Sequence, residues 1–142
     1  MNKFKKVVFA KSDFNNIGNM LSEPTINITE EQRNILTPGT LWVPIFTNPT
    51  TKEKYFTMVR EVISEPTKAK HKTPNKEKYS LQVKVKNVIE STTPIKIRKG
   101  TIHSSLMAWG NTKIDSFNEG TNGVKRKAYN EFERLVSLAI RS

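Results

Sequence analysis

The chain has 142 residues, 24 Lys and Arg against 13 Asp and Glu, a formal net charge of +11 at pH 7, and no cysteine. This length predicts a single domain spanning residues 1–142, and the lack of cysteine excludes disulfides and thiolate-bound metals. The charge favours nucleic acid as a partner. No apolar run approaches the ~20 residues of a membrane span, so we expect a cytoplasmic protein without a membrane partner.

The amino-terminal third predicts one strand followed by short helices. Aromatic and β-branched residues in Lys3–Lys11 are typical of a strand. Asp13–Leu21 has apolar residues at helical spacing, and a second short helix is expected from Thr29 through Leu36. It begins with Thr29 and Gln32 at the spacing of a capping box.

Two strands follow. Leu41–Phe46 is apolar on both faces, which is typical of a buried strand, but Pro44 lacks a backbone donor and indicates a bulge or an edge position. The segment Thr47–Glu53 contains an Asn-Pro turn signal and leads into a second strand, Lys54–Ile63.

The segment from Pro66 to Lys99 carries most of the charge. It holds ten basic and two acidic residues, and therefore +8 of the net +11. Residues 64–78 are expected to form a flexible basic loop. In Tyr79–Val88 and Pro94–Lys99 apolar and polar residues alternate, which predicts two strands that pair as a hairpin.

This hairpin would have one apolar and one basic face. The expected core residues are Leu81, Val83, Val85, Ile95 and Ile97, and the cations of the other face are Lys84, Lys86, Lys96 and Arg98. Like charges facing one another across strands are destabilising, so this face predicts contact with phosphates. The alternative is a solvated face whose lysines discourage aggregation.

The carboxy-terminal third predicts a fifth strand within Thr101–Trp109 and an amphipathic helix over Val124–Arg141. Three cations, Lys125, Arg126 and Lys127, occupy the first turn of the helix, where its dipole favours anions. Gly120–Lys127 is therefore a second candidate phosphate site; the alternative is a glycine turn before an exposed basic helix.

These elements predict an α+β fold. We expect a mostly antiparallel twisted sheet or small barrel of four to six strands, packed by the carboxy-terminal amphipathic helix and by short amino-terminal helices.

Groups suited to catalysis are few. The only histidines are His71 and His103, no cluster has the spacing of metal ligands, and no metal or cofactor is expected. A metal-independent ribonuclease needs a base, an acid and a cation for the phosphate, and Arg60 and His103 are the candidates if they converge.

Pro38-Gly-Thr-Leu-Trp42, followed by an apolar strand, a turn and a strand carrying Arg60, resembles the start of MazF-like (PemK-type) toxin ribonucleases. The sequence departs from that family at Thr40, where Asp is usual, and at Glu61, where Pro is usual. The resemblance implies a small barrel and an endoribonuclease activity.

The leading hypothesis is a small basic protein that binds DNA or RNA through backbone phosphates. Heavy use of Lys, Asn, Ile and Thr, typical of AT-rich genomes, suggests a phage- or plasmid-encoded source. The cations expected to make the contacts are Lys68, Lys70, Lys72, Lys84, Lys86, Lys96, Arg98, Lys125, Arg126 and Lys127. Tyr79 and Trp109 are candidates for stacking on bases. The alternatives are the metal-independent endoribonuclease and an inhibitor or adaptor that docks on a protein partner, a nucleic-acid enzyme.

Overall fold

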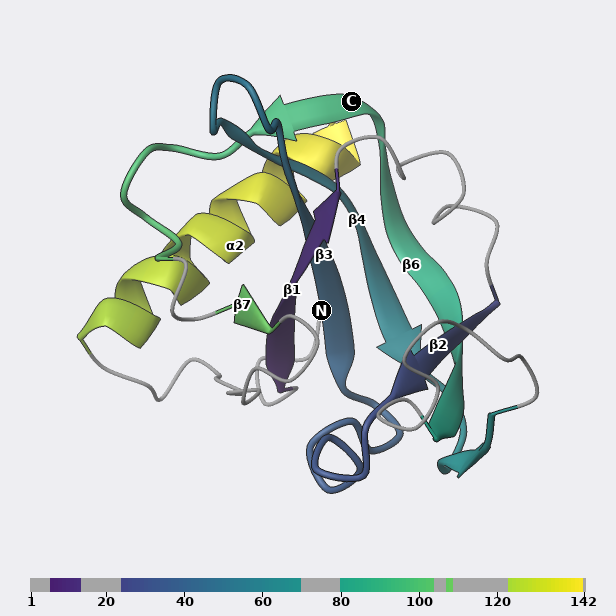
Figure 1. Cartoon of the computed structure of the whole chain (residues 1–142). Coiled ribbons are helices and arrows are strands. Elements are labelled where there is room, and N and C mark those ends of the chain that lie inside the picture. The colour runs from purple at the N-terminus through teal and green to yellow at the C-terminus, as the bar shows by residue number, and fades with distance from the viewer. Residues whose placement is uncertain (1–5, 14–23, 70–79, 104–106, 109–122, 142) are drawn as a thin grey trace.

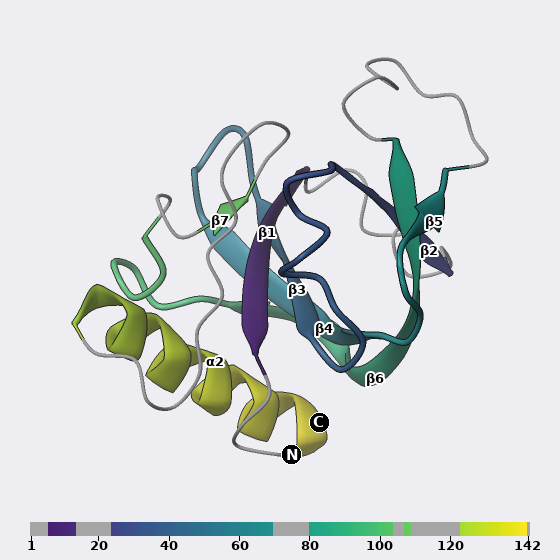
Figure 2. The same cartoon turned by 90° about the horizontal axis from the view of Figure 1, so that it is seen from below.

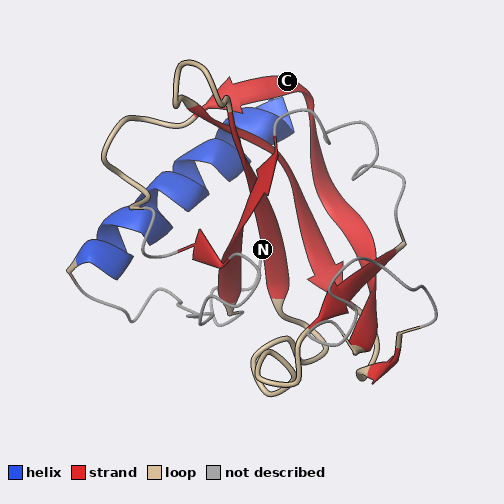
Figure 3. Cartoon of the chain, viewed as in Figure 1, coloured by secondary structure: helices blue, strands red, loops and turns tan. Residues whose placement is uncertain are grey.

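The computed structural model describes residues 6–13, 24–69, 80–103, 107–108 and 123–141. The described elements, shown in Figures 1 and 3, are β1 (Val7–Asp13), β2 (Thr25–Ile28), β3 (Leu41–Thr47), β4 (Lys54–Val62), β5 (Thr67–Lys68), β6 (Leu81–Lys96), β7 (Met107–Ala108) and the helix α2 (Val124–Arg141).

The strands form one curled, mostly antiparallel sheet, a half-barrel, in the order β2-β6-β4-β3-β1-β7, and β5 also pairs with β6. The central strands β3, β4 and β6 are antiparallel neighbours, whereas β1 runs parallel to both β3 and β7. Figure 2 shows α2 lying across one face of the sheet, with β2 and β5 at the far end of the molecule. The expected α+β class and mostly antiparallel sheet are therefore confirmed, but the sheet has seven described strands and not the expected four to six.

The central strands β3 and β4 are buried on both faces along most of their length, which explains why Leu41–Phe46 of β3 is apolar throughout. Alternate residues of one strand enter different clusters: Val7 and Phe9 of β1 pack beneath α2, whereas Val8 packs with Ile28 of β2 on the opposite side. The cluster beneath α2 is completed by Leu41, Val43, Ile45, Phe56, Val59, Ile97, Ile102 and the inward side of the helix.

The helix forms over Val124–Arg141 as predicted. Its buried stripe includes Phe132, which has no exposed surface and meets the Phe9 ring edge-on at a centroid distance of 6.2 Å. Complete burial of one such side chain contributes about 1.5–3 kcal/mol to folding. This stripe fastens α2 to the sheet.

Local turn signals in the first half of the chain are also confirmed. The Asn48 side chain accepts hydrogen bonds from the amides of Thr50 (2.9 Å) and Thr51 (3.2 Å) in the β3–β4 turn. Pro44 lies where the β3–β4 register shifts, between Trp42 and Ile45, so it marks a bulge in a central strand.

In the part of the amino-terminal region that the structure describes, the expected short helices are not seen. The capping-box bonds between Thr29 and Gln32 form, but residues 29–36 make a series of turns. Only the amide of Leu36 reaches back four residues, to the carbonyl of Gln32. So short a segment does not repay the cost of helix nucleation. Of the other expected helix, Asp13 belongs to β1, and residues 14–21 lie outside the described part of the chain.

The predicted hairpin is wrong: one continuous strand, β6, covers most of the first expected strand and half of the second. Residues 89–93 contain no glycine or Asn-Gly turn, whereas Ile89, Thr92 and Thr93 are β-branched and suit an extended chain. Both halves pair with the same neighbour, since Val85 is opposite Val62 and Lys96 is opposite Tyr55 of β4. The expected alternation persists nevertheless, with Val83, Val85 and Ile97 buried and Leu81 and Ile95 partly buried.

Two further expectations hold in part. Within the predicted basic loop, Thr67–Lys68 form β5, which pairs with Leu81–Gln82, and residues 70–78 lie outside the described range. Within the predicted fifth strand, Met107–Ala108 form β7, residues 101–103 are not in a strand, and residues 104–106 and 109 lie outside the described range.

Candidate nucleic-acid interface

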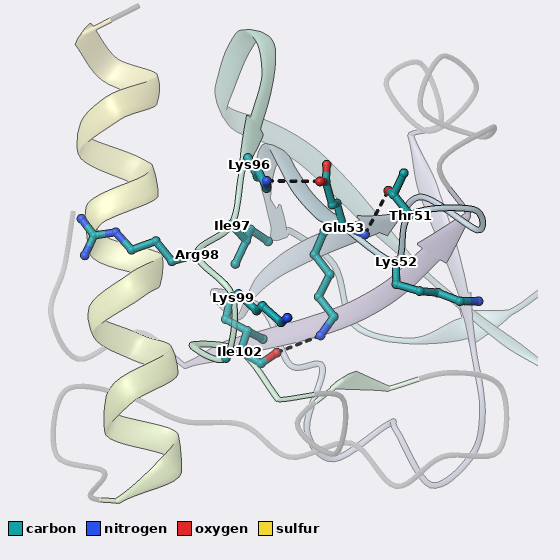
Figure 4. Close-up of a pocket in the computed structure, with 10 residues that line it drawn as sticks. Thr51, Lys52, Glu53, Lys96, Ile97, Arg98, Lys99 and Ile102 are labelled. Carbon is teal, nitrogen blue, oxygen red and sulfur yellow. Dashed lines mark hydrogen bonds and ion pairs between the residues drawn. The ribbon is translucent and has the colours of Figure 1, made fainter.

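The turn between β3 and β4 and the end of β6 enclose a cavity of about 330 Å³, here called the basic pocket (Figure 4). Its lining residues are Thr51, Lys52, Glu53, Lys54, Lys96, Ile97, Arg98, Lys99, Gly100 and Ile102. Five of these are cations and one is an acid, so the pocket has an excess of four positive charges. Such a surface attracts anions.

Sheet pairing brings these distant parts of the chain together. Tyr55 is the cross-strand partner of Lys96, and the Ile97 amide donates to the Lys54 carbonyl over 2.9 Å. Ile97 and Ile102 are buried in the cluster beneath α2, and they give the pocket an apolar base. The charges therefore stand on a rigid, well-packed support.

Lys54 is the least exposed cation of the basic pocket: it is half-buried, whereas the other four are exposed. Its Nζ donates a hydrogen bond to the Ile102 carbonyl over 3.2 Å. Burial, and then repulsion from Lys11, lower the pKa of Lys54. The pocket therefore holds a partly desolvated cation beside others of the same sign.

Glu53 is the one acid of the basic pocket. It lies 3.2 Å from the Lys96 ammonium and accepts a 2.7 Å hydrogen bond from the Tyr55 hydroxyl. The pKa of Glu53 is lowered, mainly by the hydrogen bond from Tyr55 and then by the hydrogen bond and the positive charge of Lys96. The same bond to Glu53 is the main cause that raises the pKa of Tyr55. Because the Lys96–Glu53 pair is exposed, it contributes little to stability, and Lys96 can exchange Glu53 for a phosphate.

Glu131 of α2 holds in place the backbone of Arg98, which forms one wall of the basic pocket. Its buried carboxylate accepts a hydrogen bond of 2.8 Å from the Arg98 backbone amide. It also accepts two hydrogen bonds, of 2.7 and 2.6 Å, from the Arg134 guanidinium. Burial raises the pKa of Glu131, but these hydrogen bonds and the charges of Arg134 and Arg98 outweigh it and leave the pKa lowered. The bond to Glu131 in turn raises the pKa of Arg134.

The remaining lining side chains differ in direction. In Figure 4 the side chains of Lys52 and Arg98 extend outward. The Arg98 side chain is 67% exposed, and its Nε lies 4.0 Å from Glu131. Lys54 is therefore the innermost cation of the basic pocket, and the exposed cations form its rim.

The four cations predicted to share one face are divided between the two ends of β6. Lys96 and Arg98 line the basic pocket, whereas Lys84 and Lys86 are exposed in the other half of the strand. Three of the four also have a nearby carboxylate: Glu61 opposite Lys86, Glu53 on Lys96 and Glu131 beside Arg98. The hairpin that would have brought the four cations side by side is absent, so they lie in two pairs at the two ends of β6.

Sequence reasoning missed Lys52, Lys54 and Lys99 as site residues. Lys52 and Lys54 belong to the β3–β4 hairpin, more than 40 residues before Lys96 in the chain. Lys52 and Lys54 would have been found by pairing the strand that begins at Lys54 with the strand that ends at Lys96.

The other predicted contact residues lie apart from the basic pocket. Lys68 is exposed on β5, and Lys125–Lys127 lie in the first turn of α2, where the Arg126 guanidinium is 6.0 Å from the Tyr129 ring centre. Lys70, Lys72, Tyr79, Trp109 and Gly120–Asn122 lie outside the described residues.

The two residues suggested for a ribonuclease differ in environment. Arg60 is only 2% exposed, and its Nε donates to the Asn87 side chain over 2.9 Å. His103 is exposed. Within the described ranges, no three His, Asp or Glu residues are grouped to hold a metal, and no helix there is long and apolar enough to cross a membrane.

Comparisons with known proteins identify the fold. No protein-family model matches the sequence, and no curated protein matches it. The Mmi1 YTH domain superposes with a TM-score of 0.60 and 12% identity over 100% of this chain and 94% of its own. A complex of the mmi1 YTH domain-containing protein with RNA gives a TM-score of 0.59, with 12% identity and 98% and 83% coverage. The Pho92 YTH domain in complex with m6A superposes with a TM-score of 0.54 and 14% identity, over 97% of this chain and 87% of its own. The chain therefore shares the fold of YTH domains.

Proposed function

We propose that this protein binds RNA and contacts its backbone phosphates with the basic pocket. The observation that carries the proposal is the gathering of five cations and one acid around a single cavity. The fold supports RNA over DNA as the partner, since solved structures that share it include complexes with RNA and with m6A.

The contacts available in the pocket suit phosphate. Lys54 directs one of its three ammonium protons to Ile102, which leaves two for a ligand. Lys96 and Arg98 stand at the rim, where a phosphate can replace the exposed carboxylate of Glu53. Phosphate contacts position RNA without reading its sequence.

The opposite half of β6 supplies a second set of contacts in this proposal. Lys84 and Lys86 of β6 and Lys68 of β5 are exposed there. A strand rises about 3.3 Å per residue, so Lys84 and Lys96 would be ~40 Å apart along a straight strand. The curl of β6 brings its ends closer (Figure 1), and an RNA strand of several nucleotides would bridge the two sets.

The test compares two double variants of the same strand and the same charge change. Lys96→Gln with Arg98→Gln neutralises the pocket rim, and Lys84→Gln with Lys86→Gln neutralises the other half of β6. Each phosphate contact with single-stranded RNA contributes about 0.7 to the slope of log K against log salt concentration. We expect the slope to flatten by about 1.4 in the first variant.

An unchanged slope in the Lys96/Arg98 variant would place the RNA elsewhere, and a flattened slope in the Lys84/Lys86 variant would establish the second set of contacts. The same reactions, with labelled RNA and DNA of one sequence, test the preference for RNA. RNA that remains intact, with and without EDTA, would argue against the ribonuclease alternative, which no observation in the described residues favours.

A further inference from the structure

We infer that the basic pocket holds the terminal phosphate monoester of an RNA end rather than a phosphate within the chain. This inference rests on the proposed function and specifies which chemical group of the RNA enters the pocket. The charge, depth and donors of the cavity favour such a group.

The charge of the pocket exceeds what an internal phosphate would neutralise. A phosphodiester carries one negative charge, whereas a monoester carries about −1.5 to −2 at pH 7. The lining has an excess of four positive charges, and its one acid already accepts hydrogen bonds from Tyr55 and Lys96. The more highly charged anion is the better match.

The depth of the pocket favours a chain end. Lys54 is half-buried behind an exposed rim that includes Lys96 and Arg98. The cavity has a volume of about 330 Å³. This space accommodates a phosphate and the sugar attached to it. An internal phosphate reaching Lys54 would have to bring a nucleoside on each side into the same space.

The donors within the pocket also suit a monoester. Lys54 retains two ammonium protons beyond its bond to Ile102, and Lys99 lines the same pocket. A monoester presents three strong acceptor oxygens to these groups. The lowered pKa of Lys54, caused by burial and by Lys11, indicates that its charge is poorly compensated without an anion.

The test measures affinity for one short unstructured RNA bearing either a phosphate or a hydroxyl at its 5′ end, with the label at the 3′ end. A second pair varies the 3′ end with the label at the 5′ end, which distinguishes the two possible sources of a terminal monoester. We expect about ten-fold tighter binding to the phosphorylated form of one pair.

The variants locate this preference. Lys54→Gln removes the deepest cation, and Lys99→Gln removes an exposed one that does not risk the fold. Arg141→Gln, at the exposed end of α2 and outside both sets of contacts, is the control with the same charge change. We expect the preference to disappear in Lys54→Gln and Lys99→Gln and to persist in Arg141→Gln.

Equal affinity for phosphate and hydroxyl ends would overturn the inference and leave the proposed function standing, provided that the Lys96/Arg98 variant still flattens the salt slope. A preference that survives both pocket variants would also overturn it. A mononucleotide that binds as tightly as the RNA end would show that a small molecule is the ligand. Failure to bind any RNA would refute the proposed function itself.

Discussion

The carboxylate of Glu131, in the middle of α2, accepts a 2.8 Å hydrogen bond from the backbone amide of Arg98, 33 residues away in the chain. The same carboxylate binds Arg134 with two hydrogen bonds. The wall of the basic pocket is thus attached to the helix by one buried acid, so the stability of the fold and the shape of the candidate site depend on the same residue.

Replacing Glu131 with Ala should lower the free energy of unfolding by about 3 kcal/mol, because the Arg98 amide and the Arg134 guanidinium lose their shared acceptor. Urea denaturation followed by circular dichroism would measure it. Glu133→Ala, an exposed change on the same helix, is the matched control and should have little effect. Similar losses in both variants would show that the Glu131 network is not a specific source of stability.

The same carboxylate predicts an acid-sensitive fold. The pKa of Glu131 is lowered in the folded state, so the carboxylate binds its proton more readily when the chain is unfolded. Its stabilisation is therefore complete above the ordinary glutamate pKa of about 4.3 and is lost as the pH falls through the folded value. Denaturation at a series of pH values from about 6 to about 3 would measure this loss. The stability of the Glu131→Gln variant should depend less on pH over that range. If the variant loses stability with acid as the wild type does, other carboxylates cause the pH dependence.

Glu53→Gln should strengthen RNA binding several-fold at low salt. The change removes the acid that pairs with Lys96 and adds one unit of positive charge to the basic pocket. Fluorescence anisotropy with labelled RNA would measure the affinity. Glu31→Gln, an exposed change outside the pocket, alters the net charge equally and should have a much smaller effect. Equal gains from both variants would indicate a response to net charge alone.

Phe132→Ala should destabilise the protein by about 3–5 kcal/mol, because it opens a cavity where the helix meets Phe9 of β1. Ile140→Ala removes an apolar side chain that is 68% exposed on the same helix, and it should change stability by less than about 0.5 kcal/mol. Thermal unfolding of the two variants provides the comparison. A small effect at Phe132 would mean that α2 contributes less to the core than its burial indicates.

The features that the sequence by itself determined are those set by neighbours along the chain. The helical spacing of Ala128, Phe132 and Leu135 defines the buried stripe of α2, and the alternation in β6 defines which side chains face inward. The capping-box bonds of Thr29 and the Asn48 turn form as expected, because each joins residues at most three positions apart.

Tertiary structure alone decided how the strands join and where the charges gather. β4 pairs along most of β6, which makes one strand of two expected ones, and β1 pairs in parallel with β3. The basic pocket combines Lys54 with Lys99, which come together only after the sheet has formed. Periodicity shows which side of a strand is buried, but the neighbour of that strand is selected by the packing of the whole core. That selection depends on contacts between residues far apart in sequence.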